Sequence, residues 1–60
     1  MNILDATKNQ IEFEEYFEAC CAESRKLGYV HPAVFRIDIE ECYEEGKSVQ
    51  QCVDECFNGT

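Results

Sequence analysis

The apolar residues of this chain recur at the spacing of an α-helix in three successive segments, and no stretch alternates as a β-strand would. In the first segment the apolar stripe consists of Phe13, Tyr16, Phe17, Cys20, Ser24 and Leu27. The glutamates between them fall outside this stripe, which is about 100° wide. The pattern predicts an all-α fold.

Start and stop signals bound the first segment. Thr7-Lys8-Asn9-Gln10 has the form of a capping box, in which the first and fourth residues satisfy each other's backbone amides. Gly28 follows two cations and is the natural left-handed end of a helix. We therefore expect the first helix to span residues 7–27.

The second segment is expected to be a helix over residues 32–45, because Pro32 suits a first turn and Gly46 a stop. Its main apolar face consists of Phe35, Ile39, Cys42 and Tyr43. Val34 and Ile37 lie on nearly the opposite side. Either the third helix or a partner must cover these two residues.

The third segment opens with a second capping box, Ser48-Val49-Gln50-Gln51, and closes at Asn58-Gly59. Its stripe of Val49, Cys52, Val53, Cys56 and Phe57 predicts a short helix over residues 48–57. The chain is thus expected to form a single helical domain over residues 1–60. It would be either a small three-helix bundle or a helical hairpin that carries a short C-terminal helix.

A chain of 60 residues buries too little apolar surface to be very stable alone. Disulfides, a metal or oligomerisation usually supply the difference in such small domains. We expect a two-fold homodimer, because helix 32–45 has two apolar sides. The candidate interface residues are Tyr29, Val30, Val34 and Ile37.

Thirteen Asp and Glu against five Lys and Arg give a net charge of −8. This charge disfavours direct binding to nucleic acid, which requires cations to neutralise phosphates. No apolar run is long enough for a membrane span, and the acidic N-terminal segment does not resemble a signal peptide, so a cytoplasmic location is expected. The candidates for an acidic contact face are Glu40, Glu41, Glu44 and Glu45.

The five cysteines are Cys20, Cys21, Cys42, Cys52 and Cys56. Their odd number and the absence of an export signal favour buried, reduced thiols over a disulfide framework. No cofactor or metal is therefore expected. The alternative is a zinc site that uses Cys52 and Cys56, one helical turn apart, with Cys20 or Cys21 and with Cys42 or His31.

No enzymatic signature is present in the sequence. His31 is the only histidine and lies just before Pro32, where a turn residue at the start of a helix is the simplest interpretation. Adjacent glutamates diverge by about 100° on a helix, so the paired acids do not predict a carboxylate dyad or a calcium loop. The sequence therefore favours a protein without catalytic activity.

In its start at Met1, its length, its acidic first helix after MNILDATKNQ and its free cysteines, the chain resembles the very small acidic helical proteins encoded in early regions of lambdoid bacteriophages, such as the exo–xis interval. The resemblance implies a modulator of host or phage regulation that acts through protein contacts. No functional residue carries over from it.

Three hypotheses about function follow. The favoured one is a non-enzymatic regulatory module that binds itself and another protein. The second is an acidic decoy that mimics DNA and occupies a nucleic-acid-binding protein, because a strong negative field steers a chain toward basic surfaces. The third is a small zinc or redox thiol protein.

Overall fold

Three α-helices and two short 3₁₀ helices make up the part of the chain that the structure describes. The computed structural model describes residues 2–58, and no β-strand occurs among them. In chain order the elements are η1 (Ile3–Asp5), α1 (Phe13–Lys26), η2 (Pro32–Phe35), α2 (Arg36–Glu44) and α3 (Val49–Phe57). The predicted all-α fold with three helices is confirmed.

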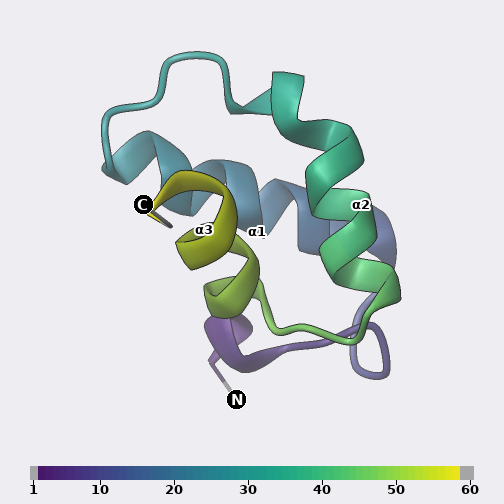
Figure 1. Ribbon diagram of the computed structural model, residues 1–60. Helices are drawn as coiled ribbons and strands as arrows, with labels where there is room; N and C mark the ends of the chain where they lie inside the picture. The colour runs from purple at the N-terminus through teal and green to yellow at the C-terminus, as the bar shows by residue number, and fades with distance from the viewer. Residues whose placement is uncertain (1, 59–60) are drawn as a thin grey trace.

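The helices form a small bundle and not an extended hairpin. The domain measures 28 × 22 × 20 Å, and α3 packs against both α1 and α2 (Figure 1). One cluster of buried side chains fills the space between the three helices. Its members are Tyr16, Cys20, Ile39, Cys42, Val49, Cys52, Val53 and Phe57.

The predicted start of the first helix at Thr7 is wrong, because α1 begins at Phe13. The Thr7–Gln10 capping box forms only a single turn, in which the Gln10 side chain accepts from the Thr7 amide at 2.6 Å and from its hydroxyl at 2.7 Å. Just before this turn, the buried Ala6 accepts a hydrogen bond from the amide of Val49 at the start of α3. Packing the N-terminal segment onto α3 therefore competes successfully with two further turns of α1.

The second segment is divided into two kinds of helix where the sequence predicted one. Residues Pro32–Phe35 form the 3₁₀ helix η2, and the α-helix starts only at Arg36. The predicted stops after the first two helices are confirmed, since Gly28 has φ of +104° and Gly46 has φ of +79°. Both values lie in the left-handed region that favours glycine.

The N-terminus of α3 agrees with its predicted capping box. The Ser48 hydroxyl accepts from the Gln51 amide at 3.2 Å, and the Gln51 side chain accepts from the Ser48 amide at 2.9 Å. Asn58 is the C-cap of this helix, as expected. The predicted stop at Gly59 lies outside the described residues.

Each of the three tyrosines donates a hydrogen bond to a main-chain carbonyl far away in the sequence. The Tyr16 hydroxyl lies 2.9 Å from the Lys47 carbonyl oxygen and 3.1 Å from that of Ser48. Tyr29 donates to the carbonyl of Phe57 at 2.8 Å, and Tyr43 donates to that of Ile11 at 3.0 Å. These bonds attach the α2–α3 connection, the end of α3 and the N-terminal segment to the bundle.

The helices are short. Within the described residues, none has the length and the apolar character that crossing a lipid bilayer requires.

Candidate functional site

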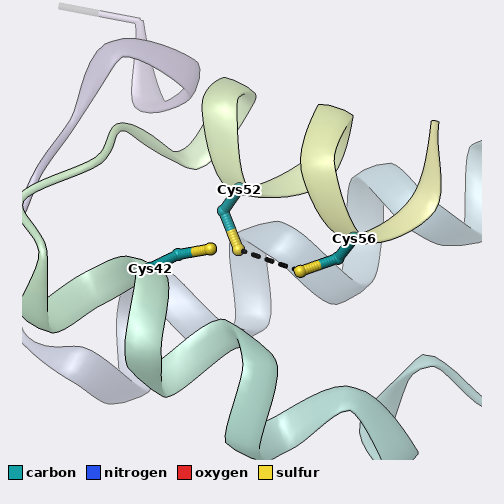
Figure 2. A group of neighbouring side chains, drawn as sticks. All are labelled: Cys42, Cys52 and Cys56. Carbon is teal, nitrogen blue, oxygen red and sulfur yellow. Dashed lines mark hydrogen bonds between the residues drawn. The ribbon is translucent and has the colours of Figure 1, made fainter. Parts of the chain in front are cut away.

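Three cysteine side chains converge where α2 meets α3. Cys42 comes from α2, and Cys52 and Cys56 come from successive turns of α3 (Figure 2). Their three sulfur atoms all lie within 4.8 Å of one another, and the Cys52 and Cys56 sulfurs are 4.0 Å apart. Cys42 and Cys52 are buried, whereas Cys56 is partly exposed. We call these three residues the thiol cluster.

The environment of the thiol cluster keeps its members protonated. Burial, together with the neighbouring Cys52 thiol, raises the pKa of Cys42 to about 11. The adjacent Cys20 thiol and burial raise the pKa of Cys52, and burial also raises the pKa of Cys56. Near pH 7 these groups are therefore neutral thiols rather than reactive thiolates.

An open pocket of about 370 Å³ leads to the thiol cluster. Cys42 and Cys56 form part of its lining, next to Phe35. Its charged wall consists of Asp38, Glu41, Glu45, Lys47 and Glu55. Lys47 pairs with Glu45 at 3.0 Å and with Glu55 at 2.6 Å, while neither Asp38 nor Glu41 forms an ion pair within residues 2–58. The pocket therefore places an anionic surface beside the sulfur atoms.

The raised thiol pKa values predict that metal-free protein loses stability at alkaline pH. Below the ordinary thiol pKa of about 9, both states are protonated and the native state has its full stability. Above that pH the unfolded chain loses thiol protons that the folded chain retains, so stability should fall continuously as the pH rises from about 9 towards 11, the folded pKa of Cys42. Urea unfolding at several pH values, with reductant and chelator present, measures this loss. A free energy of unfolding that is unchanged between pH 8 and about pH 10.5 would contradict the raised thiol pKa values of the folded chain.

Of the residues in the zinc alternative, the structure brings together Cys42, Cys52 and Cys56 and leaves the others outside the set. Cys20 on α1 lies against Cys52 but is not among the three mutually close sulfurs. Cys21 is buried elsewhere, and His31 is an exposed residue at the start of η2. All five cysteines are free thiols.

The predicted interface residues fall into two groups. Val30, Val34 and Ile37 are 77%, 77% and 74% exposed, so α3 covers none of them. We call these three residues the apolar patch. Tyr29 is only 38% exposed, because its ring packs edge-on against Phe35 and Phe57 at centroid distances of 6.3 and 4.9 Å.

A second pocket involves η2, the short helix that also carries Val34. It has a volume of about 390 Å³ and lies between α1 and η2. Ala33, which is adjacent to Val34 in the chain, lines it together with Phe17, Glu18, Cys21 and Arg25. None of the three patch residues lines this pocket, and η2 carries both Ala33 and Val34.

The four glutamates of the predicted acidic face are all exposed, but only two of them lie at the pocket. Glu41 and Glu45 line the pocket beside the thiol cluster, and Glu40 and Glu44 do not. Sequence reasoning missed Asp38 and Glu55 as members of this wall. The i, i+3, i+7 spacing of Asp38, Glu41 and Glu45 was a usable signal for one side of it.

No protein-family model, curated protein or solved structure matches this chain. The resemblance to small phage proteins therefore stays a prediction. The thiol cluster and the apolar patch are the two features of the structure that bear on function.

Proposed function

We propose that this chain is a non-enzymatic interaction module that forms a two-fold homodimer through the apolar patch. The observation that carries the proposal is the exposure of Val30, Val34 and Ile37, each about three-quarters accessible. Val34 and Ile37 are three residues apart and lie on one side of the η2–α2 segment, and Val30 lies in the connection that leads into η2. Leaving three branched apolar side chains in water is unfavourable unless another surface covers them.

The size of the domain supports a contact between chains. A stable interface buries about 800 Å² on each partner. The whole domain exposes 3918 Å², so such a contact would cover about a fifth of its surface. The apolar patch provides the centre of this area, and the second pocket, beside Ala33, provides a recess for side chains of the second copy.

The distribution of charge also favours this side for self-association. Arg36 is adjacent to Ile37, and its guanidinium lies over the rings of Phe13 and Phe17 at 5.1 and 5.0 Å. Arg25 lines the second pocket. Arg36 thus lies over Phe17, which lines the same pocket as Arg25, and these two of the chain's five cations reduce the repulsion between two copies on this side.

Analytical ultracentrifugation tests the homodimer. We expect the wild type to sediment as a dimer at tens of micromolar, and Ile37→Glu to sediment as a monomer, because the substitution places two carboxylates across the symmetry axis. Circular dichroism should show that the variant keeps its helices, since Ile37 takes no part in the buried cluster.

The control is Asp54→Asn, which changes an exposed residue of α3, a helix that does not cover the apolar patch, and should remain dimeric. A wild type that sediments as a monomer at these concentrations contradicts the homodimer. A folded Ile37→Glu variant that stays dimeric would place the interface elsewhere.

The resemblance to early proteins of lambdoid phages supports a regulatory role in the cytoplasm of a host cell. In this role the dimer would bind a host or phage protein and modulate its activity. The acidic residues that lie away from the apolar patch would then remain exposed on both protomers, where they favour partners with basic surfaces.

A further inference from the structure

We propose that the thiol cluster is a binding site for a single zinc ion, with Cys42, Cys52 and Cys56 as its protein ligands. The proposal rests on the convergence of three sulfur atoms from two helices within 4.8 Å of one another, beside a pocket open to solvent. It is independent of the homodimer, because none of these residues belongs to the apolar patch.

The geometry of the cluster fits zinc with only small movements. Zinc–sulfur bonds are about 2.3 Å long, and tetrahedral zinc therefore holds its sulfur ligands about 3.8 Å apart. The Cys52 and Cys56 sulfurs are already 4.0 Å apart, and no pair exceeds 4.8 Å. The largest contraction needed is thus about 1 Å, which side-chain rotations can supply without separating α2 from α3.

The position of two ligands on α3 is suitable for shared coordination. Cys52 and Cys56 are four residues apart, so they project from the same face of the helix on adjacent turns. Pairs of ligands at this spacing chelate zinc in helical metal sites. Cys42 supplies the third sulfur from across the α2–α3 contact (Figure 2).

The pocket explains both access and the fourth ligand position. Cys42 and Cys56 line the pocket, so an ion that enters from solvent reaches sulfur directly. The carboxylates of Asp38 and Glu41, which form no ion pair within residues 2–58, lie on the same wall and attract a dication. A water molecule or one of these carboxylates completes a tetrahedral site with three protein sulfurs.

Zinc coordination would also neutralise the negative charges of three neighbouring thiolates. Zinc replaces the protons of the three thiols, and these three protons pass to the solvent. A dication between the sulfurs stabilises thiolates that would otherwise repel one another in a buried position. Sulfur ligands select a soft or borderline cation such as zinc over calcium or magnesium, which prefer oxygen.

The test is native mass spectrometry of untagged, reduced, chelator-treated protein, titrated separately with zinc and with calcium. We expect one zinc per chain and no stoichiometric calcium. Cobalt in place of zinc should give the near-ultraviolet absorption of sulfur-to-metal charge transfer. Zinc should also protect Cys42, Cys52 and Cys56 of the wild type from alkylation after partial unfolding, while Cys21 still reacts.

Cys56→Ser is the most informative variant, because Cys56 is only partly buried and its replacement should preserve the fold. We expect it to lower zinc affinity at least tenfold and to lose the cobalt absorption band. The matched control, Cys21→Ser, changes a buried thiol outside the cluster and should retain both. If the Cys56→Ser variant does not fold, the test is the alkylation of the wild type. Zinc must then protect the three cysteines of the thiol cluster and leave Cys21 reactive.

Several results would overturn the proposal. One is the absence of stoichiometric zinc binding at micromolar concentrations. Another is binding that Cys56→Ser leaves unchanged, or equal binding of calcium, either of which would assign the ion to the carboxylates. A third is a Cys42–Cys52 disulfide that forms in air in a protein that does not bind zinc, which would make the cluster a redox pair.

Discussion

Replacing Tyr16 by alanine is expected to remove most of the stability of the domain. The Tyr16 side chain is completely buried, and removing a buried aromatic ring costs about 3–5 kcal/mol. A domain of 60 residues has a total stability of only about 3–9 kcal/mol. The substitution also removes the hydroxyl that bonds to Lys47 and Ser48, so the α2–α3 connection loses its attachment to α1. Far-UV circular dichroism with urea titration measures the loss.

Tyr16→Phe separates the two contributions of this residue. It keeps the ring and its edge-on contact with Tyr43, whose centroid is 5.0 Å away, and removes only the hydrogen bonds. We expect it to cost about 1–3 kcal/mol and to leave a cooperative transition. If Tyr16→Ala unfolds at nearly the same urea concentration as the wild type, the packing described for α1 is incorrect.

The second large effect is expected at Ile39. This residue is fully buried on α2, and truncation to alanine should cost about 2–5 kcal/mol through lost burial and an unfilled cavity. Ile37 lies two residues away on the same helix and is 74% exposed, so Ile37→Ala should change monomer stability by less than about 0.5 kcal/mol. The two variants remove the same atoms from the same residue type, which makes each the control for the other.

Urea unfolding in dilute solution, where the protein is monomeric, measures this difference. Similar losses for the two isoleucines would mean that both are covered within one chain. In more concentrated protein, the Ile37→Ala variant should be less stable to urea than the wild type, and the difference should grow with protein concentration, because the substitution also weakens association.

The sequence predicted the three helices, the glycine stops and the start of α3, because these depend on neighbouring residues. It failed at Thr7, although the capping box there has the same form as the one at Ser48. The difference lies in tertiary contacts: the Ala6 carbonyl bonds to Val49, which draws the segment away from α1. A local motif fixes a turn, but packing decides whether a helix continues from it.

The candidate sites show the same limit. Spacing alone identified Cys52 and Cys56 as neighbours on one helix face, but choosing Cys42 over Cys20, Cys21 and His31 required the relative placement of α2 and α3. Spacing also showed that Val34 and Ile37 oppose the main face of their helix. That α3 leaves them exposed could not be predicted, because periodicity within one helix does not determine where another helix lies.

The tyrosine hydrogen bonds connect the N-terminal and C-terminal halves of the chain. They join residues that are 28, 31 and 32 positions apart, about half of the whole sequence. Each therefore closes a long loop, and contacts of high sequence separation slow folding relative to simple helical hairpins. A cut between Val30 and His31, after Tyr29, would divide all three bonds between two fragments. Neither fragment retains these contacts, so we expect neither fragment to fold alone.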